Sequence, residues 1–422
     1  MSKADWDRLQ YYSRKVKSFL AFPSEYYDPG IHYSTFDRIA QKFQSSFLFP
    51  SLRHLYCNLG DMSAYSTSLP VFLSPHLNSL ELSDIYGSEN TFVAPFLASL
   101  SSQILSRIVL RGGKMLADTL KESIVRFKHL RSLELLDAIF MSDFVLFEVL
   151  GTLPSLENLT LMANDPECHP AQAPESSNSQ SGGRKYFEAL ESVSVTGSFF
   201  LIQHLLGFID SPCLKSIDLS PLINHVRTEH DPADLFTRSM TIVASKWSQS
   251  LKHLVINSSS AHRPAIPKCL MLLTDLHEMQ TFHLTDWGME IMDDDVRRLA
   301  MSWPKLRTLR LPLQRTLISL TTLGIIAENC PVLRYLDVRL DTSTIPPFDT
   351  SRKSLRHNLK VLTVGKVYPS ETMLEGQIQV ARHLDFIFPY LKSIKVPVRP
   401  SDVTWSGIRD LVKLCQDARQ VK

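Results

Sequence analysis

A short apolar motif recurs along almost the whole chain, and this recurrence constrains the fold more than any other feature. The motif has apolar residues at its first, fourth and sixth positions, as in Leu77, Leu80 and Leu82. Thirteen copies recur about every 28 residues, and a weaker fourteenth begins at Val16. The thirteen copies begin at Leu52, Leu77, Leu105, Leu130, Leu156, Leu190, Leu214, Leu251, Met279, Leu306, Leu333, Leu359 and Leu391. Self-similarity at a fixed period of this length is the signature of a repeat architecture.

Prolines and segments with helical periodicity separate the copies. In seven copies, including those beginning at Leu52 and Leu306, a proline stands two residues before the first apolar position. Proline cannot continue a helix, so it marks the turn into each strand. Between copies, segments such as 316–326 place apolar residues along one helical face. These short strands in register fit stacked repeats better than an ordinary α/β sheet, whose buried strands would be longer and continuously apolar.

The spacing of strands and helices predicts the shape of such a stack. Parallel strands lie about 4.8 Å apart, whereas a helix with its side chains needs about 10 Å. We therefore predict an α/β repeat solenoid with about 13–14 repeats, curved like a horseshoe, with parallel strands on the concave face and helices on the convex face. Because side chains alternate along a strand, the first, fourth and sixth positions point into the core, and the third and fifth point into the concavity.

Composition is that of a folded protein without a strong charge bias. The chain has 422 residues, of which 61 are leucine, and a formal net charge of +2. This charge gives no overall attraction to nucleic acid or anionic membranes. The sequence contains no signal peptide and no apolar run long enough to span a membrane. We expect a cytoplasmic and/or nuclear monomer that binds neither nucleic acid nor membranes.

Several segments are similar to one known family. Residues 325–338, IIAENCPVLRYLDV, closely resemble the repeats of leucine-rich F-box proteins. Residues 5–19, DWDRLQYYSRKVKSF, are similar to the segment that follows the F-box in mushroom-type fungal F-box-like proteins, as are 49–55 and 72–80. The resemblance covers most of residues 5–418. It implies leucine-rich repeats with true helices, and recognition of protein substrates for a cullin-type ubiquitin ligase.

The F-box itself has no match in this chain. Three explanations stay open: the module was lost, the sequence begins downstream of it, or the protein is a stand-alone repeat protein. The ligase adaptor is therefore expected as a partner only if an F-box is encoded upstream.

The two ends and one interruption divide the chain further. We expect an N-terminal cap helix and first weak repeat at 1–24, a repeat solenoid at 25–400 and a C-terminal capping helix at 401–422. Residues 164–186 are polar, rich in proline and serine, and aperiodic. This composition predicts a mobile insertion.

No pattern of residues predicts catalysis. The sequence contains no glycine-rich phosphate loop, no nucleophile elbow and no zinc-protease motif. Residues 293–295 are three aspartates, but they stand where a helix is expected to start, and carboxylates there complement the helix dipole. The six cysteines lack the spacing of zinc sites, so we expect core thiols. We expect no enzymatic activity, no cofactor and no metal.

The expected binding surface is the row of third and fifth positions in the late repeats. Aromatic and arginine side chains dominate interface hot spots, which makes Tyr335, Arg310 and Arg339 the candidate anchors. The candidate partner-binding residues are Arg310, Tyr335, Asp337, Arg339, His283 and Lys395. The function expected is a protein-interaction scaffold that forms the substrate-recognition part of an F-box-type ubiquitin ligase receptor. The alternatives are a small-molecule sensor with a pocket on the concave surface, a stand-alone adaptor without a ligase link, and a solvated face without a ligand.

Overall fold

The structure is a computed structural model of the chain, which forms two compact units, Met1–Cys213 and Leu214–Lys422. The residues that it describes are 2–21, 33–42, 47–59, 66–85, 90–100, 104–112, 116–137, 144–163, 186–222, 232–257, 269–285, 291–312, 317–347, 355, 357–364, 374–396 and 403–420. The insertion predicted at 164–186 lies outside these residues, except for Tyr186.

The N-terminal unit alternates short strands with helices. Its described strands form a parallel sheet in sequence order: β1 (Ser18–Ala21), β2 (His54–Asn58), β3 (Ser79–Ser83), β4 (Arg107–Arg111), β5 (Ser132–Leu136), β6 (Asn158–Met162) and β7 (Ser192–Gly197). Its described helices are α1 (Lys3–Ser13), α2 (Tyr33–Lys42), the 3-10 helix η1 (Ser66–Phe72), α3 (Asn90–Ser99), α4 (Leu116–Ile124), α5 (Phe144–Gly151) and α6 (Phe199–Phe208).

The C-terminal unit repeats the same alternation. Its described parallel sheet contains, in order, β8 (Ser216–Pro221), β9 (His253–Asn257), β10 (Thr281–Thr285), β11 (Thr308–Leu311), β13 (Tyr335–Val338), β15 (Val361–Val364) and β16 (Ser393–Lys395). A second, two-stranded parallel sheet pairs β12 (Ile318–Ser319) with β14 (Leu340–Asp341). The described helices are α7 (Pro232–Trp247), the 3-10 helix η3 (Cys269–Asp275), α8 (Asp293–Ser302), α9 (Leu320–Asn329), α10 (Leu374–Ile387) and α11 (Val403–Gln420).

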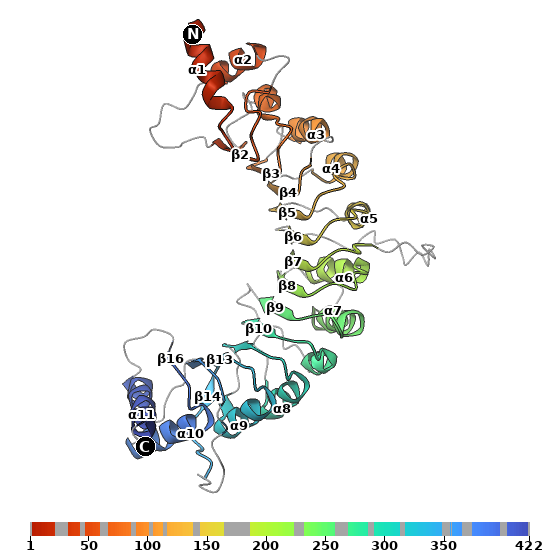
Figure 1. The fold of residues 1–422 in the computed structure, drawn as a ribbon. Coiled ribbons are helices and arrows are strands. Elements are labelled where there is room, and N and C mark those ends of the chain that lie inside the picture. Colours follow the sequence, from red (N-terminus) through yellow and green to blue (C-terminus); the bar gives the residue numbers. More distant parts are fainter. Residues whose placement is uncertain are drawn as a thin grey trace. The chain divides into compact units, whose positions relative to one another are not determined.

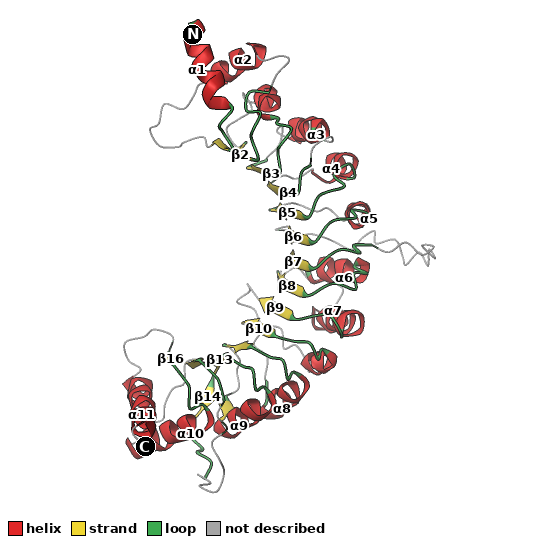
Figure 2. Ribbon diagram, in the orientation of Figure 1, coloured by secondary structure: helices red, strands yellow, loops and turns green. Residues whose placement is uncertain are grey.

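Strands and helices occupy opposite faces within each unit. The strands line one face, and the helices that connect them cover the other (Figure 1). Figure 2 shows that this separation holds from one repeat to the next. Each copy of the apolar motif coincides with one of the strands β1–β11, β13, β15 and β16, including the weak copy that begins at Val16. The predicted α/β leucine-rich-repeat fold, with parallel strands on one side and helices on the other, is therefore confirmed.

The apolar positions of the motif form the core. Residues of adjacent strands pair in phase, so that Leu309 lies opposite Leu336, and Leu336 lies opposite Leu362. All three side chains are buried, whereas the residues between them in each strand are half-buried or exposed. Stacking in phase thus places like positions together, with leucine inside and polar side chains on the opposite face.

A repeated pair of backbone hydrogen bonds sets where each strand begins. The carbonyl of Arg307, at the second motif position, accepts the N–H groups of Arg334 and Tyr335 at 2.8 and 3.1 Å. The carbonyl of Arg334 in turn accepts those of Lys360 and Val361 at 2.9 and 3.1 Å. In this way the second residue of one repeat aligns the second and third residues of the next.

The last helix covers the end of the C-terminal unit. Arg419 of α11 donates from Nη2 to Asp385 Oδ1 on α10 and to the Pro389 carbonyl, both at 2.9 Å. Gln416 Nε2 donates to the Leu391 carbonyl at 3.0 Å. These bonds hold α11 against the final strand–helix repeat. Among the helices that the structure describes, none combines the length and the apolar character needed to cross a bilayer.

Candidate functional site

The outward-pointing side chains of the C-terminal sheet form a surface that we call the strand face. It consists of the third and fifth motif positions of strands β8–β11, β13, β15 and β16. The third positions are Ser216, His253, Thr281, Thr308, Tyr335, Val361 and Ser393. The fifth positions are Asp218, Val255, His283, Arg310, Asp337, Thr363 and Lys395.

The sheet register brings three of the candidate residues into one row. Arg310 lies directly between His283 and Asp337 on neighbouring strands. Tyr335 is two residues before Asp337 on the same strand, and 47% of its surface is exposed. Side chains opposite each other on adjacent strands are within contact distance, so these four residues form one cluster.

The other two candidates lie at the border of this cluster. Lys395 pairs with Thr363, which separates it from Asp337 by one strand. Arg339 follows β13 and is half-buried, and its carbonyl accepts the Ile318 N–H at 2.8 Å. Arg339 therefore belongs to the junction between the large sheet and the β12–β14 pair.

Asp337 carries an unusual polar atom. Its Oδ1 is buried and has no hydrogen-bond partner among the described residues. Burial raises the pKa of Asp337 above its usual value, and the charge of neighbouring Arg310 opposes that rise. Buried polar atoms in folded proteins are nearly always hydrogen-bonded, so this oxygen is an acceptor available for a donor from a ligand.

The two histidines of the strand face are uncharged at neutral pH. Burial lowers the pKa of His283, and the charge of Arg310 lowers it further. Burial also lowers the pKa of His253, and the charges of Lys252 and Arg307 lower it further. The positive charge of this surface therefore comes from its arginines and lysines.

A row of basic residues adjoins the strand face but lies outside its third and fifth motif positions. It occupies the second motif position, immediately after the first leucine. The basic ladder, as we call it, consists of Lys215, Lys252, Arg307, Arg334, Lys360 and Lys392, with Gln280 at the one uncharged step. The sequence signal that reveals it is a leucine–lysine or leucine–arginine pair at the start of nearly every late repeat.

The N-terminal unit has no matching row of charge. Its second positions are Lys17, Arg53, Asn78, Ser106, Arg131, Glu157 and Glu191. On its outward strand positions, Arg107 Nη2 lies 2.8 Å from Glu134 Oε1, and Arg107 Nη1 lies 4.0 Å from Glu81 Oε2. The charges of that unit are thus mixed and partly paired with one another.

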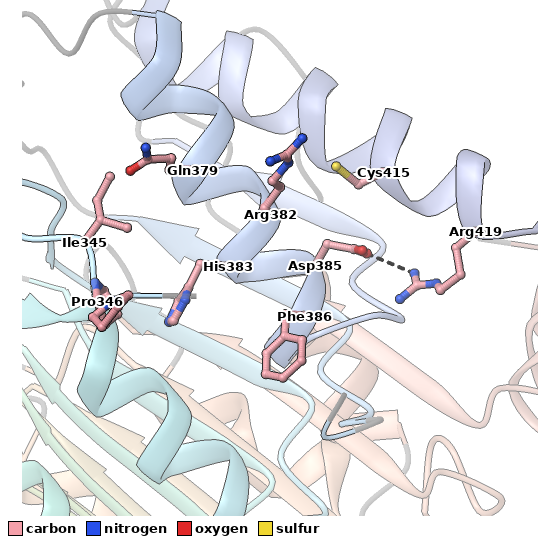
Figure 3. Close-up of a pocket in the computed structure, with 10 residues that line it drawn as sticks. Ile345, Pro346, Gln379, Arg382, His383, Asp385, Phe386, Cys415 and Arg419 are labelled. Atoms are coloured by element: carbon pink, nitrogen blue, oxygen red, sulfur yellow. Dashed lines mark hydrogen bonds and ion pairs between the residues drawn. The ribbon is translucent and has the colours of Figure 1, made fainter. Parts of the chain in front are cut away.

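A cavity of about 750 Å³ lies on the helical side of the C-terminal unit. Side chains from α10, α11 and the segment 345–347 line it (Figure 3). Its wall combines apolar groups, such as Phe386, with the polar side chains of Gln379 and Arg382. The pocket considered for a small-molecule sensor was expected on the concave surface, whereas this cavity is built from helices.

The charged groups of this cavity are partly paired. The Arg419–Asp385 bond closes one side of it (Figure 3). Burial raises the pKa of Asp385, and Arg419 opposes that rise. Burial also raises the pKa of the Cys415 thiol, which keeps it protonated at neutral pH. Arg382 forms no hydrogen bond or ion pair within the described part of the chain.

Comparisons with known proteins identify no family. No family model matches the chain, and no curated protein matches it. A solved protein from Bacteroides fragilis is similar at 14% identity with a TM-score of 0.36; the match covers 62% of this chain and 65% of that one, just under two thirds. The yeast Rad7–Elc1 complex contains a chain similar at 15% identity with a TM-score of 0.39, covering 88% of this chain and 87% of that one. Similarities this distant do not bear on function.

Proposed function

We propose that this protein is a non-catalytic interaction scaffold whose strand face in the C-terminal unit binds a protein partner. The observation that carries the proposal is the buried, unpartnered Oδ1 of Asp337 beside the exposed side chains of Arg310 and Tyr335. Arginine and tyrosine are enriched in interface hot spots. A partner donor that reached Asp337 would satisfy the one acceptor of the cluster that the described residues leave unpaired.

We further propose that the partner is a substrate presented to a ubiquitin ligase in the cytoplasm or the nucleus. The support for this step is the resemblance of residues 325–338 to the repeats of leucine-rich F-box proteins. The protein recruits a ligase adaptor only if an F-box is encoded upstream of this sequence. Transcript sequencing across the 5′ end, followed by co-precipitation of the adaptor with the resulting full-length chain, tests this step.

Replacing both exposed anchors is expected to abolish partner capture. In the variant Arg310→Glu/Tyr335→Ala, the charge of one anchor is reversed and the ring of the other is removed. Truncation of a single hot-spot residue costs about 2 kcal/mol or more, so we expect the pair to reduce binding by about 100-fold or more. The measurement is quantitative mass spectrometry of proteins that co-purify with the wild-type and variant chains from cells.

A matched variant on the helical face separates a binding defect from a general effect. Arg297 and Met301 lie on α8 with exposed side chains, so Arg297→Glu/Met301→Ala makes similar changes away from the strand face. Among the described residues, Arg297 pairs only with exposed Asp294 at 3.5 Å, a contact that contributes little to stability. Proteins lost from the strand-face variant but kept by this control are partners. If no protein distinguishes the two variants, the strand face is not the binding surface.

The cavity between α10 and α11 supports a second candidate function, the sensing of a small molecule. Its volume of about 750 Å³ falls within the usual range of ligand sites, and its lining combines apolar groups such as Phe386 with polar and charged side chains. Arg382 provides a cation for an anionic substituent. A ligand at 100 times its Kd stabilises the folded state by about 2.7 kcal/mol.

A thermal-shift screen of small aromatic and aliphatic carboxylates tests this function. A compound that binds in the cavity is expected to raise the Tm of the wild-type chain and to lose most of that effect in Arg382→Ala. If no compound raises the Tm, or if the shift persists in the variant, the cavity is not the ligand site.

A further inference from the structure

The basic ladder has a regular spacing because the backbone imposes it. Each ladder residue donates its N–H to the carbonyl of the preceding one, as Lys252 does to Lys215 at 2.8 Å and Lys392 to Lys360 at 2.9 Å. Adjacent strands lie about 4.8 Å apart, so the seven positions from β8 to β16 span about 29 Å. An extended peptide advances about 3.3 Å per residue and needs about nine residues to cover this length.

The central cations of the ladder are available to a ligand. Arg307 and Arg334 have exposed side chains and form no ion pair with any residue that the structure describes. Lys360 donates to the neutral Asn358 Oδ1 at 3.3 Å, and its Nζ lies 5.8 Å from the ring centre of Tyr390. Neither neighbour of Lys360 cancels its charge, so the ladder keeps a positive potential along the sheet.

The ladder ends in a groove. Lys360, Tyr390 and Lys392 form one wall of a hollow of about 590 Å³, and α11 forms the opposite wall. The helix contributes Lys413 and Arg409 together with two aspartates, of which Asp410 pairs with Arg409 at 3.4 Å. A chain that follows the ladder therefore reaches a recess that can hold a side chain or a terminus.

The adjoining strand face indicates that the anionic ligand is a peptide. Asp218 and Asp337 lie on the fifth positions beside the ladder, where their carboxyl oxygens are acceptors for a ligand that carries hydrogen-bond donors. The unpartnered Oδ1 of Asp337 needs a hydrogen-bond donor. Peptide N–H groups and partner side chains supply donors at every residue, whereas phosphate groups supply only acceptors.

We propose that the basic ladder binds an extended acidic segment, about nine residues long, of the protein partner. This inference rests on the proposed function, because it specifies the partner chemistry of the same surface. Aspartate and glutamate side chains of the segment pair with the ladder cations, which steers association and fixes the direction of the bound chain.

The binding of a fluorescein-labelled decaglutamate peptide to the full chain, followed by fluorescence anisotropy, tests the proposal. In Arg307→Glu/Arg334→Glu, two central cations become anions, and we expect the Kd to rise by about tenfold or more at low ionic strength. Pentaglutamate is expected to bind the wild-type chain much more weakly than decaglutamate, and a fifteen-residue polyglutamate only slightly better.

The matched control makes the same change of charge in the N-terminal unit. Arg53 and Arg131 occupy the same motif position there, so Arg53→Glu/Arg131→Glu alters the net charge equally. Within the part of the chain that the structure describes, Arg131 pairs only with exposed Glu157, at 3.5 Å, and the loss of such a pair has little effect on folding. We expect this control to change the Kd by less than about twofold.

Four results would overturn the proposal. The first is equal weakening in the two variants, and the second is an affinity that does not depend on peptide length. The third is tighter binding of a ten-residue oligothymidylate than of decaglutamate, which would assign the ladder to nucleic acid. A partner that is lost from Arg310→Glu/Tyr335→Ala but still captured by Arg307→Glu/Arg334→Glu would refute the ladder while leaving the proposed function intact.

Discussion

Replacing Trp303 by alanine is expected to destabilise the C-terminal unit by about 3–5 kcal/mol. Trp303 is fully buried at the end of α8, and its ring centre lies 5.0 Å from that of Phe282. Its Nε1 donates to the Leu273 carbonyl at 3.1 Å. The substitution creates a large cavity and also removes one of two donors to the Leu273 carbonyl, which still accepts the Leu276 N–H at 3.1 Å, so both losses act in the same direction.

Two further variants separate these contributions. Trp303→Phe removes the Nε1 donor and part of the ring volume but keeps the remaining apolar contact, so we expect a smaller loss of about 1–3 kcal/mol. Met301→Ala, an exposed position on the same helix, should change the free energy of unfolding by no more than about 0.5 kcal/mol. Urea unfolding followed by far-UV circular dichroism measures all three. A loss below about 1 kcal/mol for Trp303→Ala would contradict the packing described for this repeat.

Removing the buried imidazole of His357 is expected to have the second large effect. The side chain is only 4% exposed and joins two backbone groups. Leu359 donates its N–H to Nδ1 at 3.1 Å, which requires Nδ1 to be unprotonated. Nε2 therefore carries the hydrogen and donates to the Cys330 carbonyl at 2.8 Å. His357→Ala leaves the Leu359 N–H without a partner, at a cost of about 1–3 kcal/mol for a buried group, and removes one of two donors to the Cys330 carbonyl, which still accepts the Leu333 N–H at 3.0 Å.

The same residue makes stability depend on pH. Burial lowers the pKa of His357 in the folded state below the ordinary histidine value of 6.5, although the hydrogen bond to Cys330 opposes this shift. The unfolded chain therefore binds more protons than the folded chain as the pH falls below about 6.5, and the stability contributed by the neutral ring is lost. We expect the wild-type chain to be less stable at about pH 5 than at neutral pH, and the difference to be smaller in His357→Ala.

His129 provides the matched control for this prediction. It is exposed in the N-terminal unit, so His129→Ala should change the free energy of unfolding by no more than about 0.5 kcal/mol. Burial also lowers the pKa values of His204, His253, His283 and His383, so part of the acid sensitivity should persist without His357. Chemical unfolding at several pH values measures these differences. Identical pH profiles of the wild-type chain and His357→Ala would refute the role of the ring.

The repeat motif predicts most of the fold because its period and its alternation are both local. Leu77, Leu80 and Leu82 have the spacing of one strand with an inward face, and the structure places all three in the core. The in-phase register then follows, since any slip by one residue would expose the leucines. For this reason the row containing His283, Arg310 and Asp337 follows directly from the sequence.

The features that the sequence did not reveal depend on contacts between distant segments. The cavity on the helical side combines Ile345, Gln379 and Cys415, which come from three separate elements. The unpartnered oxygen of Asp337 is recognised only when the atoms around it are known. The basic ladder differs from both, because its leucine–cation pairs are visible in the sequence. They were missed because the ladder occupies the second motif position, whereas alternation along a strand assigns only the third and fifth positions to the open face.

The backbone bonds at the second motif position also separate assembly from recognition. The carbonyl of Arg307 aligns the following strand, and its guanidinium group takes no part in those bonds. Substitutions of such side chains can therefore alter ligand preference while the backbone hydrogen bonds between adjacent repeats are preserved. Surfaces of this type are well suited to evolutionary diversification, because specificity can be exchanged one repeat at a time without redesign of the framework.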